Sequence, residues 1–278
     1  MLKNTFHHIP GIGAKTEAHI WNRGILDWGS FHTRNNGVLS HGRTRLAQNI
    51  IDQSYEELKK ENSTYFTDLL PSRLHWRIFP EFRNHTVYLD IETTGMDGFS
   101  TITTIALYDG KHIRWYVDGE NLDHFLDDIF NYKVIITYNG KGFDIPFIEK
   151  QFRIKLEQSH IDLRFVLSSL GFSGGLKGCE RQLGINRGEL SGVDGYFAVL
   201  LWHDYIRNNN HRALETLLAY NIEDVVNLEK LMVIAYNMKI KDTPFMDSHC
   251  LDLPRYPNIP FKPNIETIVR IKREYMIV

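Results

Sequence analysis

The stretch HTVYLDIETTG, from His85 to Gly95, places two carboxylates, Asp90 and Glu92, two residues apart at the end of an apolar run. The run is typical of a buried strand, and residues i and i+2 of a strand point to the same face. Two like charges on one face repel and raise each other's pKa. A basic partner, or a strand that ends at the surface, would offset this repulsion without any chemistry, and a bound cation would offset it as well.

A second segment, TYNGKGFDIPFI from Thr137 to Ile148, again runs from an apolar strand into a polar turn. Gly140 and Gly142 give the backbone of this turn its freedom. Asp144 follows at the expected start of a helix. An aspartate there is commonly an N-cap that accepts hydrogen bonds from the first N–H groups. On its own, Asp144 therefore indicates capping as much as chemistry.

A third segment, LLAYNIEDVVNLEKL from Leu217 to Leu231, has the apolar spacing of a helix. Tyr220 and Asp224 are four residues apart, so they are neighbours on one helical face. Alone, the pair is also consistent with a tyrosine at the edge of the core beside a solvated aspartate.

Together the three segments supply four carboxylates, from a strand end, a helix start and a helix face: Asp90, Glu92, Asp144 and Asp224. Hard oxygen ligands of this kind suit Mg²⁺ or Mn²⁺. Two such ions, about 3.5–4 Å apart, can hold the attacking and leaving oxygens of a phosphodiester displacement. The metal charge would neutralise the cluster, so we expect two Mg²⁺ or Mn²⁺ ions at this strand end.

The motifs DIETTG, YNGKGFDIP and YNIED resemble the three exonuclease motifs of the DEDD superfamily of ribonuclease H-like 3′–5′ exonucleases. The proofreading domains of family-B DNA polymerases are similar in all three, and the resemblance extends over roughly residues 86–236. The third motif matches the Tyr-x-x-x-Asp form through Tyr220. The alternative form, with His five residues before the Asp, is excluded because position 219 is Ala. Residues 178–206 resemble the stand-alone members of the superfamily.

This resemblance implies that the four carboxylates hold the metals and that Tyr220 orients the attacking water. It also implies nucleic-acid contacts by five residues around the first two motifs: Thr93, Thr94, Met96, Asn139 and Phe143. The roles of three further residues stay open at this point. Asp162 can lie just outside the site or simply end a strand, His160 is better explained by structure, and Lys177 is either a surface lysine or a phosphate contact.

Near the N-terminus, FHHIPGIGAKTEAHIWNRGI contains a tight Pro-Gly-Ile-Gly turn that runs into a helix. Glycine N–H groups at a helix N-terminus form a ready anion site. The stretch resembles the helix-hairpin-helix motif, which implies phosphate contacts by Gly11, Gly13 and Lys15. Few residues precede the turn, so the first helix would be very short. The alternative is a simple turn that starts a helix.

The elements that position these motifs alternate in type. Strands are expected over residues 86–92, 101–109, 112–117, 133–138 and 160–163, with Asp-Gly hairpin signals after the first two. Helices are expected over residues 14–23, 40–62, 121–130 and 144–152, and then to about residue 237. This order predicts an α/β, ribonuclease H-like fold: a mixed five-stranded sheet flanked by helices, after a small helical N-terminal region.

Three regions are predicted: a helical nucleic-acid-binding region over residues 1–80, the exonuclease domain over 81–240, and an extended tail over 241–278. The tail holds five prolines, and its last stretch, ETIVRIKREYMIV, is expected to end as a strand. The formal net charges of the three regions are +3, −6 and +1, within a total of −2. The acidic middle region is thus the one that contains the proposed metal ligands.

Composition narrows the class of protein. Apolar residues make up 42% of the chain and charged residues 24%, which is ordinary for a globular protein. The two cysteines, Cys179 and Cys250, form neither a disulfide framework nor a zinc pattern. We find no signal peptide, no run of 18 apolar residues and no P-loop. These observations predict a cytoplasmic protein with no membrane partner and no nucleotide cofactor, and they leave its oligomeric state open.

The sequence therefore predicts a metal-dependent 3′–5′ exonuclease on single-stranded nucleic acid, with DNA favoured as the partner. The same chemistry on RNA is the alternative, because fold-level analogy does not choose the sugar. An inactive nucleic-acid-binding module is less favoured, since all four carboxylates are present.

Overall fold

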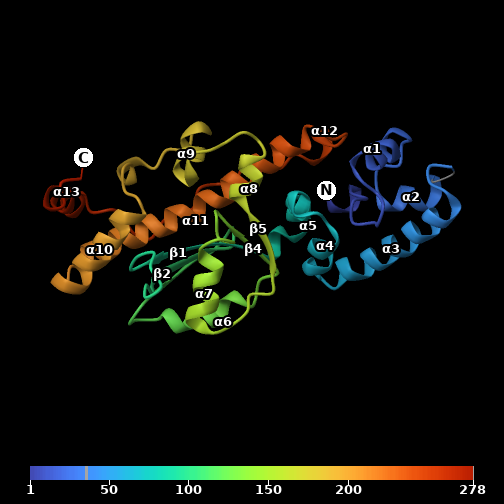
Figure 1. Cartoon of the computed structure of the whole chain (residues 1–278). Helices are drawn as coiled ribbons and strands as arrows, with labels where there is room; N and C mark the ends of the chain where they lie inside the picture. The colour runs from blue at the N-terminus through green and yellow to red at the C-terminus, as the bar shows by residue number, and fades with distance from the viewer. Residues whose placement is uncertain (35–36, 278) are drawn as a thin grey trace.

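The computed structural model describes residues 1–34 and 37–277, and its centre is a mixed five-stranded sheet (Figure 1). The strands are β1 (Thr86–Thr93), β2 (Ile102–Tyr108), β3 (Ile113–Val117), β4 (Val134–Thr137) and β5 (Ser159–Asp162). Their order is β3-β2-β1-β4-β5, with antiparallel pairs β1–β2 and β2–β3 and parallel pairs β1–β4 and β4–β5. The predicted ribonuclease H-like sheet is confirmed.

Helices precede, separate and follow the strands. Before the sheet come α1 (Ala14–Asn22), α2 (Trp28–Arg34), α3 (His41–Lys59), α4 (Ser63–Leu69) and α5 (Phe79–Phe82), with short 3₁₀ helices at Leu2–Asn4, Ser72–Ile78 and Arg83–His85. Within and after the sheet come α6 (Phe125–Ile129), α7 (Asp144–Phe152), α8 (Leu163–Ser168), α9 (Gly175–Gln182), α10 (Gly195–Asn208), α11 (His211–Ile240), α12 (Met246–His249) and α13 (Ile265–Glu274). Two more 3₁₀ helices span Leu122–His124 and Gly188–Leu190.

The two faces of the sheet follow from the alternation along β1. Val87, Leu89 and Ile91 pack in one apolar cluster with side chains of α6 and α7. Tyr88 belongs to the other cluster, which includes α11. Because side chains alternate along a strand, Asp90 and Glu92 share the face of Tyr88 and point toward α11. Figure 1 shows α11 running along that face, with α6 and α7 on the opposite side.

Helix α11 is long because its sequence is apolar over most of its circumference. Its side chains contribute to two of the three apolar clusters. The side chain of Asn210 caps its start by accepting a hydrogen bond from the N–H of Arg212. A helix that is apolar on most sides is stable only when it is buried. Its depth in the molecule explains how Tyr220 and Asp224, on the same helix, become buried.

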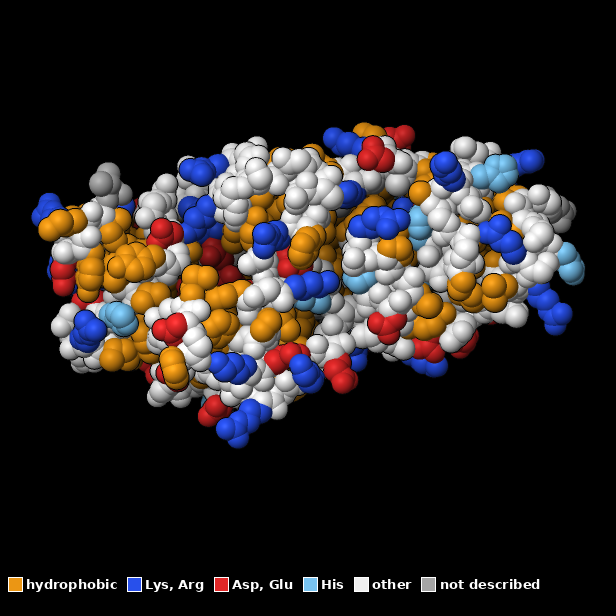
Figure 2. Space-filling view, in the orientation of Figure 1, with side chains coloured by type: hydrophobic (Ala, Val, Ile, Leu, Met, Phe, Trp, Pro, Cys, Tyr) orange, Lys and Arg blue, Asp and Glu red, His pale blue; other side chains and the backbone are white. Residues whose placement is uncertain are grey.

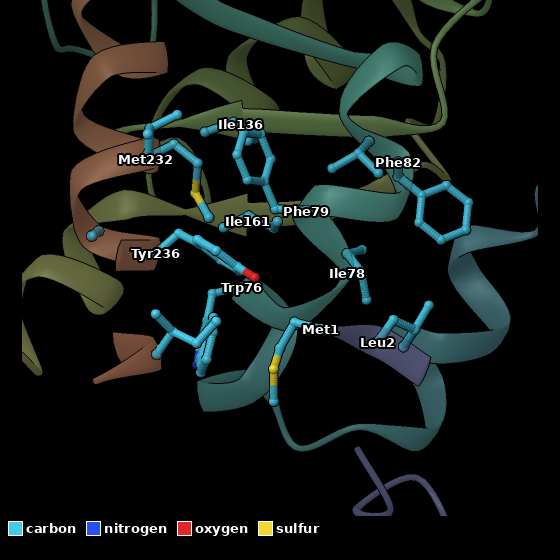
Figure 3. Close-up of a cluster of buried hydrophobic side chains, with 14 of the residues drawn as sticks. Met1, Leu2, Trp76, Ile78, Phe79, Phe82, Ile136, Ile161, Met232 and Tyr236 are labelled. Atoms are coloured by element: carbon cyan, nitrogen blue, oxygen red, sulfur yellow. The ribbon is translucent and has the colours of Figure 1, made fainter. Parts of the chain in front are cut away.

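The N-terminal region packs against the sheet and helix α11 through a continuous apolar core (Figure 3). The ring centroids of Trp76 and Tyr236 are 5.6 Å apart, and those of Phe79 and Tyr236 are 6.4 Å apart. Met1 and Leu2 are buried in the same cluster. Pro71 precedes the 3₁₀ helix Ser72–Ile78, and Pro80 lies at the start of α5. Residues 1–85 therefore pack onto the C-terminal half of α11.

Most expected helices are present with shifts of a few residues at their ends. Helix α1 stops at Asn22 and is followed by Gly24, whose φ of +74° suits glycine. The expected helix of residues 40–62 ends at Lys59, and Asn62 caps α4 instead. The long helical stretch to residue 237 is interrupted between α9 and α10 by the loop of residues 183–194.

The expected C-terminal strand is wrong, because the residues of that stretch form helix α13. Ile268 and Ile271 are three residues apart and both buried, whereas Val269 between them is exposed. The side chain of Asn264 caps the helix by accepting from the N–H of Thr267. The spacing of three residues and the cap are compatible with a helix, and the burial of the two isoleucines with side chains of α10 and α11 selects it over the strand that the β-branched composition suggested.

No helix within the described part of the chain is both long enough and apolar enough to cross a membrane.

Candidate active site

Three carboxylates converge where β1 passes α11. Ligand oxygens of Asp90, Glu92 and Asp224 all lie within 4.8 Å of one another. Glu92 and Asp224 are buried, at 9% and 4% exposure. Figure 2 shows a hollow left of centre with acidic side chains at its bottom and basic side chains on its rim. Buried, closely spaced carboxylate oxygens are the donors that Mg²⁺ and Mn²⁺ require, so these residues fit a divalent cation.

Asp144 lies beside this group at the first residue of α7 and has a backbone partner of its own. Its Oδ1 accepts a hydrogen bond from the N–H of Ile91 at 3.1 Å. The last β1–β4 pair is Tyr88 with Ile136, so β1 extends past β4 and the Ile91 N–H has no strand partner on that side. Asp144 supplies the acceptor for this N–H in place of a strand. It is 4% exposed, so this hydrogen bond offsets part of the cost of burying its carboxylate.

Burial and mutual repulsion raise the pKa values of the cluster. Burial raises the pKa of Asp90 well above its ordinary value, and the charges of Asp224 and Asp144 raise it further. Burial is also the main reason that the pKa of Glu92 is raised, followed by the charge of Asp224. Burial raises the pKa of Asp144 to about 7, although its hydrogen bond with the Ile91 N–H acts in the opposite direction. A bound cation would reverse all three effects.

Asn221 orients Asp90 from α11. Its amide Nδ2 donates to Asp90 Oδ2 at 2.7 Å, and its Oδ1 accepts from Thr104 Oγ1 at 3.1 Å. Asn221 is fully buried. Asn221 was not among the predicted site residues, although its place next to Tyr220 on a predicted core helix was a signal, because a buried amide requires partners.

Two basic side chains complete the site: Lys177, which the sequence left open as a surface lysine or a phosphate contact, and Arg187, which the sequence did not single out. Lys177 Nζ donates to Tyr220 Oη at 2.8 Å and to the carbonyl of Val193. Lys177 is therefore part of the site and is not the surface lysine that its sequence also allowed. Burial lowers the pKa of Lys177, against the neighbouring charge of Asp224. The Nζ also lies 4.5 Å from the centre of the Tyr220 ring.

Arg187 comes from the loop between α9 and α10 and forms an ion pair with Asp224. Its Nη2 donates to Glu180 Oε1 at 2.7 Å, and its side chain is only 6% exposed. No local spacing links position 187 to position 224, so this pairing is visible only in three dimensions. Together with Lys177, Arg187 places two positive charges beside the carboxylates.

Tyr220 itself is 4% exposed and lies one helical turn before Asp224. Burial raises its pKa well above the ordinary value, and the charges of Asp224 and Glu92 add to this. Because its oxygen accepts from Lys177, the hydroxyl proton of Tyr220 remains available to a second partner.

The second motif forms a turn that Asp162 holds in shape. Asp162 accepts hydrogen bonds from the backbone N–H of Asn139 at 2.8 Å and of Lys141 at 3.2 Å. Asn139 has a φ of +65°, and its side-chain oxygen accepts from Arg164. A Cβ on Gly140 would lie only 2.2 Å from Thr137 Oγ1, so no larger residue fits there. The same Thr137 hydroxyl pairs with His160 Nε2 at 2.9 Å, which gives His160 a structural contact.

The other candidate contacts of the first two motifs are Thr93, Thr94, Met96 and Phe143. Thr93 Oγ1 donates to the carbonyl of Gly95, and Thr94 Oγ1 accepts from the N–H of Thr101, so both hold the turn between β1 and β2. Met96, in that turn, is 88% exposed. Phe143 is half-buried and packs on Phe147 with ring centroids 4.8 Å apart.

The glycine turn near the N-terminus lies away from the carboxylate cluster, at the end of the molecule formed by α1–α3 (Figure 1). Gly11 has a φ of +80°, and its carbonyl accepts from Arg43 Nη2 at 2.6 Å. Gly13 is the N-cap of α1, and Lys15 is exposed in its first turn. The helix before the turn is a three-residue 3₁₀ helix. The structure thus adds Arg43 to the basic groups around this turn.

Comparison with known proteins gives a family match and a structural similarity. A family model described as the RNase_H superfamily matches residues 87–250. The comparison with curated proteins finds no match. Among solved structures, the chain is similar to the family B DNA polymerase from the hyperthermophilic archaeon Pyrobaculum calidifontis, at 16% sequence identity and a TM-score of 0.42. The similarity covers 56% of this chain and 24% of the polymerase chain, so the chain spans about a quarter of that polymerase.

Proposed function

The chain belongs to the RNase_H superfamily, and from this premise we propose that it is a metal-dependent 3′–5′ exonuclease of the DEDDy type. Its substrate would be single-stranded nucleic acid, with DNA favoured over RNA. The observation that carries the proposal is the convergence of Asp90, Glu92 and Asp224 from two elements that are distant in sequence. Residues 81–240 would form the catalytic domain and residues 1–80 an accessory region for the strand.

Asp90, Glu92, Asp224 and Asp144 would hold two Mg²⁺ or Mn²⁺ ions. When bound, such ions polarise the phosphodiester and stabilise the charge that develops in the transition state. Asn221 fixes the orientation of Asp90, and the Ile91 N–H fixes that of Asp144. Both carboxylates are therefore set in position before a ligand arrives, which lowers the reorganisation needed during the reaction.

Tyr220 would orient the attacking water through its hydroxyl. Lys177 supports this role because it occupies an acceptor site of the Tyr220 oxygen and leaves the proton to point elsewhere. The high pKa of Tyr220 favours a hydrogen-bond donor rather than a base. Tyr220 would then act by orienting the water molecule and would not remove its proton.

The strand would reach the carboxylates past the two motif turns. Met96, on the exposed turn between β1 and β2, would contact a base, with Thr93 and Thr94 holding that turn. Asn139 and Phe143 would hold the 3′ end. At the other end of the molecule, Gly11, Gly13 and Lys15 would contact a phosphate of the same strand without reading its sequence, as in a helix-hairpin-helix.

Degradation of end-labelled strands tests the proposal. Single- and double-stranded DNA and RNA, each labelled at the 5′ or the 3′ end, should be incubated with Mg²⁺, Mn²⁺ or EDTA, with Asp90→Asn as the matched inactive control. A 5′ label should give a ladder of shortening strands, and a 3′ label should give mononucleotides at once, with cleavage lost in EDTA. Cleavage of RNA alone would assign the substrate to RNA. Binding without cleavage in either metal would show a binding module and refute the enzyme.

A further inference from the structure

A cavity of about 400 Å³ lies where the N-terminal region meets the edge of the sheet. One wall is the 3₁₀ helix Ser72–Ile78, which contributes Arg73 and His75, and the other wall consists of β5, α8 and Lys141 of the second motif. The volume is within the range of small-molecule sites, about 300–1,000 Å³. Tyr220 and the four carboxylates of the candidate active site do not belong to the lining, so the cavity is separate from that site.

Hydrogen bonds join the two walls, so the cavity is formed before any ligand arrives. The hydroxyl oxygens of Thr67 and Ser159 lie 3.0 Å apart, which links α4 to β5. Ser63 Oγ donates to the carbonyl of Lys133 at 2.8 Å, just before β4. Strand β5 is the last strand in the order of the sheet, and the N-terminal region packs along this edge. A preformed cavity binds its ligand without the cost of ordering its walls.

Two cations of the cavity have no partner within the part of the chain that the structure describes. Arg73 and Lys141 are exposed, and their side chains form no hydrogen bond or ion pair with the described residues. Asp162 also lines the cavity, but its two oxygens accept from the backbone N–H groups of Asn139 and Lys141. The cavity therefore favours an anion, and arginine and lysine side chains are common phosphate ligands.

The two histidines of the lining, His75 and His160, are neutral. Burial lowers the pKa of both, that of His160 to about 3. The Nε2 of His75 lies 3.0 Å from the carbonyl oxygen of Thr67, and the Nε2 of His160 lies 2.9 Å from Thr137 Oγ1. Because both rings are neutral and bonded within the protein, the positive charge of the cavity comes from the arginine and the lysine.

An exposed aromatic ring also lines the cavity. Phe165, the third residue of α8, is 60% exposed. Its neighbour Val166 packs on the core, whereas Phe165 belongs to none of the three apolar clusters of the described residues. Cations beside an exposed aromatic ring are typical of proteins that bind single strands, because the cations contact phosphates and the ring stacks on a base.

The position of the cavity fits a strand that leads away from the second motif. Lys141 lies two residues after Asn139 and three before Asp144. Strand β5 lies beyond β4 on the side away from β2, and Figure 1 shows the N-terminal helices farther in the same direction. Figure 2 shows basic and histidine side chains near the middle of the molecule, between the acidic hollow and the end formed by α1–α3. A strand that runs from the carboxylates toward the glycine turn of residues 10–13 would pass this cavity.

We propose that the cavity binds a nucleotide of a single strand upstream of its 3′ end, with Arg73 and Lys141 on the phosphates and Phe165 stacked on the base. The inference rests on the proposed function, since the second motif would hold the 3′ end of the same strand. It adds a preference for single strands, because a paired base lies inside the duplex stack and does not offer its face to a side chain. It adds no sequence preference, because every base has a face that can stack.

Binding in EDTA tests the cavity apart from catalysis. The metal-free full chain should be titrated, with fluorescence anisotropy as the readout, against a labelled thymidine dodecanucleotide, a deoxyribose-phosphate strand of the same length without bases, and a duplex of the same length. Phe165→Ala should weaken binding of the dodecanucleotide about tenfold, as expected for one lost stacked base. The same variant should bind the abasic strand and the duplex as wild type does. Phe130→Ala, at an aromatic residue that is 52% exposed outside the lining, is the matched control and should leave all three affinities unchanged.

The cations have a different signature, because phosphates are present in the strand with and without bases. Arg73→Gln and Lys141→Gln should each weaken binding of the dodecanucleotide and of the abasic strand. Each should also reduce the salt dependence of binding by a slope of about 0.7 per lost phosphate contact. Arg207→Gln, at an exposed arginine of α10 outside the lining, is the matched control and should keep the wild-type affinity and slope.

Two results would refute the proposal. If Phe165→Ala weakens binding of the abasic strand as much as binding of the dodecanucleotide, the ring does not stack on a base. If Arg73→Gln and Lys141→Gln both keep the wild-type affinity and salt slope, the cavity does not contact phosphates. Cleavage in the labelled-strand assay without Phe165-dependent binding would refute the cavity alone. Phe165-dependent binding without cleavage would refute the nuclease and leave the single-strand site standing.

Discussion

Replacing Asp144 by asparagine would measure how strongly the folded protein disfavours charge at its candidate metal site. Asparagine keeps the shape and an oxygen that can accept from the Ile91 N–H, the partner of Asp144 at 3.1 Å. It removes only the charge. The exposed Asp252 makes no hydrogen bond or ion pair among the described residues, so Asp252→Asn is the matched control.

The magnitude follows from the pKa of Asp144, which burial raises from 3.8 to about 7. Above pH 4 the unfolded chain has released this proton, whereas the folded chain keeps it until about pH 7, so stability falls as pH rises through this window. The pKa of Asp144 is roughly 3 higher in the folded chain than in the unfolded chain, and each pH unit of this difference corresponds to about 1.4 kcal/mol. The folded state therefore loses on the order of 4 kcal/mol of stability once the pH exceeds 7. About 2 kcal/mol of this loss falls between pH 5.5 and pH 8.

Urea unfolding in EDTA at pH 5.5 and pH 8 provides the assay. Between these pH values, the stability of Asp144→Asn relative to wild type should rise by about 2 kcal/mol, while Asp252→Asn should follow wild type. Adding Mg²⁺ at pH 8 should stabilise wild type more than Asp144→Asn, because the ion offsets the charge that the variant lacks. If Asp144→Asn and wild type differ by the same amount at both pH values, Asp144 carries no buried charge and our account of the site is wrong.

Three further changes test other parts of the site. Asp90→Asn should keep the protein folded, as judged by its circular dichroism, and reduce cleavage below about 10% of wild type, since the metals supply most of the transition-state stabilisation; higher residual cleavage contradicts the metal assignment. Tyr220→Phe should lower the single-turnover rate by a factor on the order of 10–10³ with little change in strand affinity, and an unchanged rate would make Tyr220 a packing residue. Gly13→Val combined with Lys15→Gln should weaken binding of long single strands and reduce its salt dependence by a slope of about 0.7 per lost phosphate contact, measured against Lys3→Gln as an exposed control; an unchanged slope would reduce the turn to the start of a helix.

The last of these variants is preferable to removing residues 1–80. That region buries Met1, Trp76 and Phe79 against Tyr236 of α11, so its deletion would expose core. Gly11 is unsuitable as well, since its φ of +80° would strain any larger residue. Gly13 has an extended backbone, and no atom lies within 4 Å of a Cβ placed on it.

The sheet and the carboxylates of the candidate site could be predicted because the sequence patterns that indicate them are local. Alternation along β1 places Asp90 and Glu92 on one face, and helical spacing pairs Tyr220 with Asp224. The C-terminal helix was not predictable in the same way, since Thr267, Ile268, Val269 and Ile271 are β-branched and favour a strand in isolation. The burial of the two isoleucines against α10 and α11 decides the outcome, and a local pattern does not contain that contact.

The contacts of Lys177 and Arg187 with the site could not be predicted from local patterns either. Lys177 and Tyr220 are 43 residues apart, and Arg187 lies in a loop without any motif around it. Their positions depend on how α9 and its following loop pack on α11, which is a property of the tertiary structure. Asn221 and Asp162 were closer to prediction, because they adjoin motif residues in the sequence, but their hydrogen bonds depend on the same packing.

Helix α11 has a consequence for the dynamics of the site. It has 30 residues, so it is about 45 Å long. Its first half carries Tyr220 and Asp224, and its second half lies in the core with Trp76 and Phe79. A helix held along its whole length does not fray, and its amide hydrogens exchange only when the molecule opens globally. The amides near Asp224 should therefore be among the slowest to exchange, whereas those of the exposed turn at Met96 should exchange rapidly, so that the carboxylate of α11 stays fixed while the turn moves.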